Sequence, residues 1–229
     1  MKFKSQVYTQ ASGSIGGVVY SHNRGGMYTR GRAIPVNSNT IYQQAIRNAI
    51  RTLTSAWTGT LSPTQRAAWA AYADAVLIPD SLGEPRKLPP LAMFCRCNVP
   101  RLVHEATYVL SGPTVTVLPT FTAPVLTVTA PTGGSLAYTV TVGTDDWARE
   151  VGGHMYLYCS RPQGTGIGYF KGPYRYCDKV DGAVVPPTSP QVVVLPFPVV
   201  AGQNVFYRVN VSRADGGLSS SLFLSDIAA

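Results

Sequence analysis

The hydrophobic residues follow different patterns in successive parts of the chain. Between residues 40 and 77 they recur every three to four positions, as on one face of an α-helix. From residue 121 onward they form short β-branched and aromatic runs that turn-forming residues interrupt, which is typical of β-strands. Residues 1–39 contain no long apolar run. The sequence thus predicts a mainly β fold with a small α part, preceded by an extended arm.

The predicted arm, residues 1–39, contains two short strand candidates on either side of residues 22–26. Asn and Gly between these candidates supply the positive backbone φ angles of a tight turn, so the pattern predicts a β-hairpin. In the second candidate Tyr28, Arg30 and Arg32 lie two residues apart and hence on one face. Fully extended, the arm has a reach on the order of 130 Å, enough to cross onto a neighbouring subunit.

Residues 40–104 predict a small helical clamp. Thr40 and Ser62 each precede a Gln by three positions, which is the spacing of an N-terminal capping box. The two helices that they begin form a hairpin, and a third, short helix is expected over residues 91–98, ending before Pro100. Helices of this length bury little apolar surface alone, so the clamp must pack on something else.

A proline-rich linker, residues 105–120, is expected to lead into an all-β module, residues 121–229. The strand-like runs of this module lie at residues 125–128, 137–142, 155–159, 192–195, 205–211 and 221–224. Turn signals separate these runs, and no helical pattern intervenes. Several short strands with regular breaks predict a β-sandwich.

Basic residues are concentrated in the first half of the chain. The first 73 residues contain no Asp or Glu, and residues 1–104 hold 12 Lys and Arg against 3 acidic residues, whereas residues 105–229 hold 7 against 8. An uneven distribution of charge along a chain gives information about its binding partners rather than about its fold. We expect the arm to bind an acidic groove of a partner protein. The residues expected to make this contact are Tyr8, Tyr20, Arg24, Tyr28, Arg30 and Arg32.

Packaged nucleic acid is the alternative partner of the basic region. The cations that would neutralise phosphates are Arg24, Arg30, Arg32, Arg47 and Arg51. Such binding would be sensitive to salt and indifferent to base sequence, and tyrosines of the arm would stack on unpaired bases. Because no base-reading motif accompanies these residues, a partner protein is the preferred interpretation.

No arrangement of residues predicts catalysis, a metal site or a cofactor site. His22, His104 and His154 have no spacing partner that would form a metal site or a catalytic triad. The glycine-rich residues 163–168 lack the lysine and the following helix of a phosphate-binding loop and are interpreted as a hairpin tip. No run approaches the roughly 18 apolar residues of a membrane span, and residues 1–6 lead into no secretory signal. We expect a non-enzymatic protein without cofactors or a membrane partner.

Aromatic residues mark candidate surface contacts in the β module. Tyr169, Phe170 and Tyr174 belong to one predicted hairpin, and an exposed patch of such rings would indicate a contact surface. Trp147 lies in a predicted loop beside charged residues, where it either contacts a sugar or packs the loop.

The four cysteines leave two interpretations open. Cys95 and Cys97 are two positions apart, which suits neither a C-x-x-C redox pair nor a zinc knuckle. Cys159 and Cys177 lie on neighbouring strand candidates, where a disulfide can form. Without an export signal, four free thiols are the simpler expectation.

The final third of the chain resembles a fibronectin type III domain. The similarity is carried by Leu195-Pro196, Ala201-Gly202-Gln203, residues 206–211 and residues 215–219. Within this pattern Tyr207 matches the tyrosine of strand F. The resemblance implies an immunoglobulin-like sandwich that serves as a spacer or adhesion unit, and it implies no chemistry.

The first half of the chain resembles a group of small proteins encoded by tailed phages and prophages. The matching positions are Gly16-Gly17, residues 23–26, Tyr28, Arg30, residues 35–37, Gln44, Trp57, Leu61, Gln65-Arg66, Ala68-Trp69, Tyr72-Ala73, Gly83 and residues 94–101. The resemblance implies a structural protein of the virion, made in the host cytoplasm and present as a homo-oligomer or symmetric array. Its expected partners are capsid, neck or tail proteins. A head decoration protein, with the sandwich facing outward, is the first interpretation, and a neck, collar or tail component is the second.

Overall fold

The computed structural model describes residues 11–23, 26–79, 83–129, 137–141 and 145–229. The chain divides into two compact units, Met1–Gln43 and Gln44–Ala229, which are called the N-terminal unit and the main unit below. The N-terminal unit contains the predicted arm. The main unit contains the remainder, so the predicted clamp and the predicted β module belong to one compact body.

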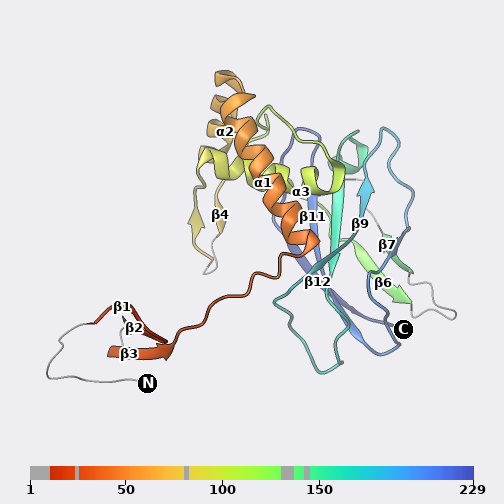
Figure 1. Ribbon diagram of the computed structural model, residues 1–229. Helices are drawn as coiled ribbons and strands as arrows, with labels where there is room; N and C mark the ends of the chain where they lie inside the picture. Colours follow the sequence, from red (N-terminus) through yellow and green to blue (C-terminus); the bar gives the residue numbers. More distant parts are fainter. Residues whose placement is uncertain (1–10, 24–25, 80–82, 130–136, 142–144) are drawn as a thin grey trace. The chain divides into compact units, whose positions relative to one another are not determined.

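The N-terminal unit contains a small antiparallel sheet with the strand order β1-β2-β3 (Figure 1). Its strands are β1 (Gly13–Ile15), β2 (Val18–Asn23) and β3 (Gly26–Gly31). The predicted hairpin is present as β2 and β3, and β1 adds a third strand. Gly16, whose φ is +57°, begins the two-residue connection between β1 and β2, where a positive φ favours glycine.

Three α-helices follow the N-terminal sheet along the chain. They are α1 (Ile41–Gly59), α2 (Pro63–Ala75) and α3 (Pro90–Glu105). Both predicted capping boxes are present: the Gln43 amide donates to Thr40 Oγ1 and the Gln65 amide donates to Ser62 Oγ, while each glutamine side chain accepts in return. The helices share one hydrophobic cluster. Its fully buried members include Leu53, Trp69, Tyr72, Met93, Phe94 and Cys97.

The third helix is longer than the sequence pattern predicts. The prediction ended it before Pro100, but it continues to Glu105 with Pro100 inside it. An internal proline costs a helix roughly 3 kcal/mol, because it lacks the amide hydrogen that would bond one turn back. Contacts with the rest of the main unit offset this cost: the Arg96 guanidinium donates to the carbonyl oxygens of Leu218 (2.9 Å) and Ser219 (2.8 Å).

The remainder of the main unit is built mainly of antiparallel sheets. The longer strands are β6 (Val125–Thr129), β7 (Ala137–Thr141), β8 (His154–Cys159), β9 (Arg175–Asp181), β10 (Gln191–Val194), β11 (Asn204–Ser212) and β12 (Leu222–Ile227). One sheet has the order β10-β7-β6 and the other the order β12-β11-β8-β9. The short strands β4 (Ile78–Pro79) and β5 (Pro85–Arg86) pair separately, and the 3-10 helix η1 (Asp146–Arg149) precedes β8.

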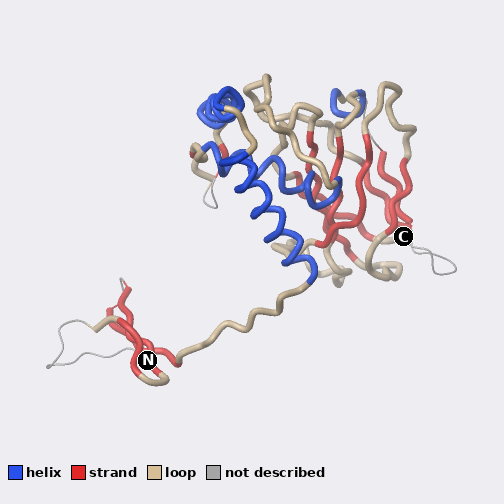
Figure 2. Tube along the Cα trace, turned by 45° about the horizontal axis from the view of Figure 1, so that its top comes forward, coloured by secondary structure: helices blue, strands red, loops and turns tan. Residues whose placement is uncertain are grey.

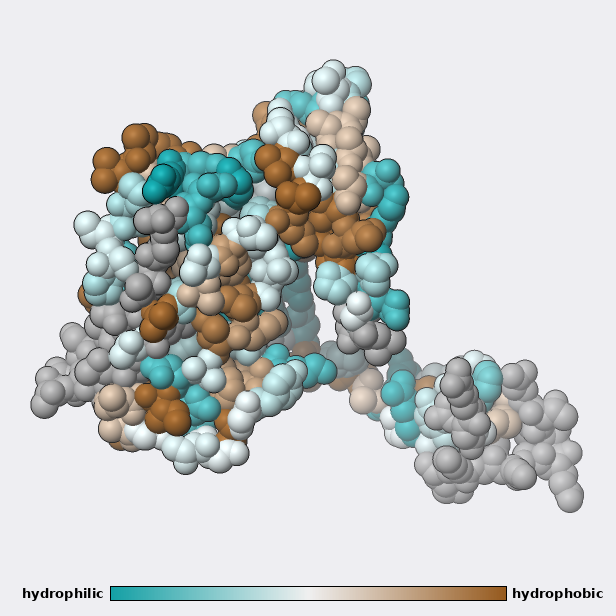
Figure 3. Space-filling model, turned by 180° about the vertical axis from the view of Figure 1, so that it is seen from behind, coloured by the Kyte–Doolittle hydropathy of each residue, from teal (hydrophilic) through white to brown (hydrophobic). Residues whose placement is uncertain are grey.

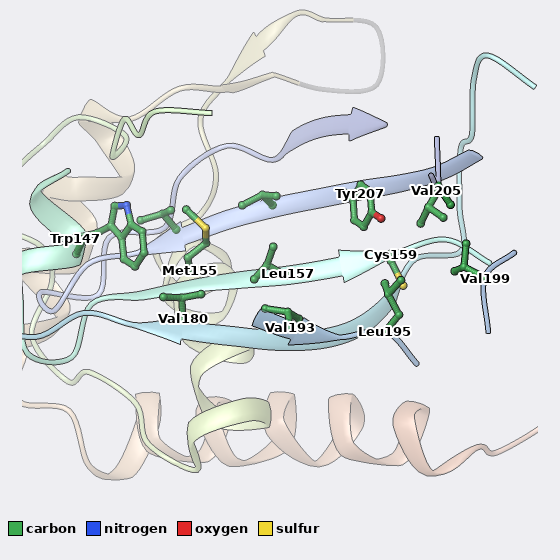
Figure 4. Packing of buried hydrophobic residues seen from close by; sticks show 14 residues of the cluster. Trp147, Met155, Leu157, Cys159, Val180, Val193, Leu195, Val199, Val205 and Tyr207 are labelled. Carbon is green, nitrogen blue, oxygen red and sulfur yellow. The ribbon is translucent and has the colours of Figure 1, made fainter. Parts of the chain in front are cut away.

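Alternate residues of β8 and β11 point into one hydrophobic cluster. Met155 and Leu157 of β8 and Tyr207 of β11 lie there with Val193 of β10 and the adjoining Leu195 (Figure 4). The period of two of a β-strand therefore places alternate side chains of β8 and β11 in this cluster. Because β10 belongs to the other sheet, the cluster is shared by both sheets.

Trp147 belongs to this cluster and not to the surface. The side chain is 1% exposed, so its assignment as a candidate surface contact is wrong. The physical reason is that η1, which carries Trp147, covers one end of the cluster, and the ring packs with residues such as Met155 (Figure 4). The alternative in which this tryptophan packs its loop is the one that the structure supports.

The second face of the four-stranded sheet is covered by α3. In Figures 1 and 2 the helices of the main unit lie to one side of the strands. Tyr156 and Tyr158 of β8 point to that side and are nonetheless buried, and the His104 ring at the end of α3 stacks on Tyr176 with ring centres 3.7 Å apart. Every residue of β8 is therefore buried, although the edge strands β9 and β12 of the same sheet are partly exposed.

The segment predicted as a linker packs on the helices. Trp69 Nε1 donates to the Leu110 carbonyl (2.8 Å), and the Val109 amide donates to Asn98 Oδ1 (2.7 Å). A β-carbon added to Gly112 would lie 2.7 Å from backbone atoms of α2. These contacts attach the segment predicted as a linker to α2 and α3.

Candidate partner-binding surfaces

The N-terminal unit has a sheet but no interior among its described residues. None of residues 11–23 and 26–43 whose burial is described is classed as buried. Ile15, Ile34 and Val36 expose 76%, 77% and 94% of their surface. In Figure 3 the part of this unit that is drawn in colour is mostly white and teal. A small sheet without a core gains little stability from burial, and a partner surface would supply what is missing.

The strand register decides which predicted contact residues of the arm share a face. Tyr28 pairs with Ser21, and Arg30 pairs with Val19, so these four residues lie on one side of the sheet. Tyr20 pairs with Thr29 and lies on the other side. The prediction that Tyr28 and Arg30 share a face is therefore confirmed, while Tyr20 belongs to the opposite face.

Of the other predicted contact residues of the arm, the structure describes Arg32 but not Tyr8 or Arg24. Arg32 directly follows β3, is exposed, and its amide still donates to the Gly17 carbonyl (2.8 Å). Tyr8 and Arg24 lie outside the described residues. Residues 1–43 carry five Lys or Arg residues and no Asp or Glu, so any surface that this unit binds is selected for negative charge.

The predicted aromatic contacts other than Trp147 do come together. Tyr169 is 78% exposed, whereas Phe170 and Tyr174 are half-buried. The rings of Phe170 and Tyr174 meet edge to face at 5.3 Å, and Phe170 stacks on Phe206 of β11 at 5.8 Å. Together with Phe223 of β12 they line a pocket of about 270 Å³. The structure therefore brings the three predicted rings together at one pocket, with Tyr169 exposed.

A cluster of charged residues at the end of α3 was not found from the sequence. His154 Nδ1 lies 2.7 Å from Asp181 Oδ1, and the Lys179 ammonium lies 3.0 Å from the same oxygen and also bonds Glu105. Burial would raise the pKa of Asp181, but hydrogen bonds from Lys179 and His154 outweigh it and lower that pKa. No spacing signal predicts the cluster, because its members come from α3, β8 and β9.

The charged cluster resembles a metal site in its geometry but not in its charge balance. Possible ligand atoms of Glu105, His154 and Asp181 lie within 4.8 Å of one another. The Lys179 ammonium, however, already bonds both carboxylates. We therefore interpret the cluster as an ion-pair network that fastens α3 to β8 and β9.

The four cysteines are free thiols. Cys97 and Cys159 are buried, and Cys95 and Cys177 are half-buried. Burial raises the pKa of Cys95, which keeps its thiol protonated.

No family model and no curated protein matches the chain. Within the described residues, no helix has both the length and the apolar character needed to cross a membrane.

Proposed function

We propose that the chain is a non-enzymatic structural protein of a tailed-phage virion, most directly a head decoration protein. Its N-terminal unit fixes it to a neighbouring virion protein, and its main unit presents an outward β-sandwich of fibronectin type III type. The observation that carries the proposal is the N-terminal sheet, which has no buried residue among those described. Such an element gains its stability by docking, as expected of an anchoring arm.

The charge of the N-terminal unit supports an acidic docking surface. Arg30 and Arg32 are exposed, and no acidic residue occurs in the first 73 positions to compete for them. Across an interface such cations contribute mainly to encounter rate and register, while burial of Tyr28 and of exposed apolar residues such as Ile15 supplies affinity.

The strand order supports the sandwich part of the proposal. A constant-type immunoglobulin sandwich places its third, sixth and seventh strands in one sheet and its first, second, fourth and fifth in the other. The main unit, counted from β6, has the same division for six of its seven strands: β8, β11 and β12 lie in one sheet and β6, β7 and β10 in the other, while the fourth strand, β9, lies beside β8. Residues of both sheets share one hydrophobic cluster, as in a sandwich.

Copy number on the particle tests this proposal. Quantitative mass spectrometry of purified particles should give a ratio to the major capsid protein near one or a simple fraction of it. A count near six or twelve would instead identify a neck, collar or tail component. Absence from particles would contradict the virion proposal. The alternative in which the basic region binds nucleic acid is tested separately: it predicts DNA binding that falls steeply between low and moderate salt.

A variant series tests the anchor itself. Particles that lack the protein are mixed with purified full-length chain, with a form lacking residues 1–39, and with two double variants. Arg30→Glu with Arg32→Glu should reduce particle occupancy about tenfold or more, whereas Arg30→Lys with Arg32→Lys, which keeps the charge, should retain most of it. Undiminished binding by the form lacking residues 1–39 would refute the anchoring role of the arm.

A further inference from the structure

Two small pockets share one aromatic residue of the connection between β8 and β9. Phe170 lines both of them. The first pocket, of about 270 Å³, is mainly aromatic, and the second, of about 280 Å³, is lined by Arg161, Gln163, Pro173 and Arg175. An apolar ring pocket thus adjoins a cationic pocket on one continuous stretch of surface.

We propose that these paired pockets bind an acidic sugar of the hexuronic acid class within an oligosaccharide. The sugar ring lies against the aromatic wall beside Tyr169, and its carboxylate lies between Arg161 and Arg175. This site is separate from the N-terminal anchor, and the proposal does not rest on the function proposed above.

The aromatic pocket has the chemistry that stacks a sugar ring. Tyr169 holds a large ring in solvent, and Phe223, on the outer face of β12, is also exposed. The C–H groups on one face of a pyranose carry slight positive charge, which suits the negative face of an aromatic ring. Ser225 at the same pocket and Gln163 at the adjoining one offer groups that can bond sugar hydroxyls.

The second pocket has the chemistry that binds a carboxylate. Arg161 and Arg175 are exposed, and among the described residues no carboxylate forms a salt bridge with either. The Arg161 guanidinium lies over the Phe197 ring at 5.6 Å, which restrains the side chain before any ligand arrives. Planar guanidinium groups match the two oxygens of a carboxylate.

The connection is fastened to the sheet, so the pockets are formed in advance. Gln163 and Asn204 exchange two backbone hydrogen bonds (2.8 and 2.9 Å), and Asn204 Nδ2 donates to the Ile167 carbonyl (3.0 Å). Further along, the Tyr174 hydroxyl donates to the Phe170 carbonyl (2.9 Å). A ligand therefore meets rings and cations that are already in place, which lowers the entropic cost of binding.

Pocket size and overall charge favour a sugar over other polyanions. Both pockets lie just below the roughly 300–1,000 Å³ of drug-sized sites, so each accommodates about one ring or one charged group. A nucleic-acid surface would carry an excess of cations along a groove, but residues 105–229 hold 7 basic against 8 acidic residues. An extended acidic peptide would need a groove along a strand edge, whereas these are two separate small pockets that share Phe170.

The test compares two oligosaccharides that differ only at the acidic group. Isothermal titration calorimetry of the full chain in 150 mM salt measures α-1,4-linked trigalacturonic acid and its neutral counterpart, α-1,4-galactotriose. We expect the acidic trimer to bind about tenfold more tightly or better, as for one charge-assisted contact. Equal binding of the two trimers, or no binding of either, would overturn the proposal.

Variants locate the binding to the two pockets. Arg161→Gln and Arg175→Gln should each weaken binding of the acidic trimer about tenfold, and Tyr169→Ala should weaken binding of both trimers. Arg149→Gln is the matched control, because it removes one exposed positive charge beside the opposite end of β8. Equal weakening by this control, or tighter binding of hexaglutamate or of a ten-residue oligothymidylate, would overturn the sugar assignment. Unchanged melting temperatures verify that the variants fold.

Discussion

Replacing Arg101 by Met tests how firmly α3 is joined to the four-stranded sheet. The side chain is buried, and its Nη1 donates to the Gly152 carbonyl (3.1 Å), to Ser212 Oγ (2.8 Å) and to the Arg213 carbonyl (3.0 Å). One nitrogen with two hydrogens cannot serve three acceptors fully, so these contacts amount to about two hydrogen bonds. A hydrogen bond to a charged group contributes about 1.5–3 kcal/mol, and relief from burying the cation offsets part of it. We expect the free energy of unfolding to fall by about 3 kcal/mol.

Urea denaturation followed by tryptophan fluorescence measures this loss. Trp69 reports on the helical cluster and Trp147 on the cluster shared by the sheets, so one cooperative transition is expected to move to lower urea for both. Ser212→Ala removes a single acceptor and should cost about 1 kcal/mol. Arg149→Met, at an exposed position, should change stability by less than about 0.5 kcal/mol. A loss below about 1 kcal/mol for Arg101→Met would refute the view that this contact joins helix and sheet.

Two further predictions concern other parts of the same junction. Burial lowers the pKa of His104 from 6.5 to about 4. Between these pH values the unfolded chain binds a proton at this histidine and the folded chain does not, so the free energy of unfolding should fall as pH drops from about 6.5 towards 4. His104→Phe keeps a ring against Tyr176 and should flatten the dependence of melting temperature on pH over that range; equal slopes would contradict this cause. Gly112→Ala should destabilise the protein by about 2 kcal/mol, since the added carbon meets the backbone of α2, whereas Gly59→Ala, with open space around it, should not. Similar melting curves for these two variants would show that residues 105–120 are not packed as described.

The elements that the sequence predicts best are those whose signals are local. Capping boxes at Thr40 and Ser62 predict the starts of α1 and α2, because the two hydrogen bonds of a box join residues only three positions apart. The β-branched and aromatic runs likewise predict β8 and β11, because such residues favour strands. The period of two of a strand then explains which of their side chains enter the cluster shared by the sheets. The aromatic surface at Tyr169 follows from adjacent residues in one connection.

The features that the sequence does not predict depend on contacts between distant segments. The length of α3 is decided by Arg96 and Arg101, which bond residues more than 50 positions away in the chain. The ion-pair network around Lys179 joins three elements that share no sequence spacing. The burial of Trp147 follows from where η1 lies against the sheets, although its charged neighbours in the sequence indicate a surface loop.

The fastening of α3 also determines how the main unit would respond to tension. Arg96 and Arg101 are five residues apart, which is about 7.5 Å along the helix. Their guanidinium groups donate hydrogen bonds to residues 212, 213, 218 and 219, around the connection between β11 and β12. A pull that separates α3 from the four-stranded sheet would load these side-chain bonds at the same time. Bonds that are strained together resist rupture better than bonds that open in succession. Under the function proposed above, force on the main unit would be carried by a short row of arginine contacts.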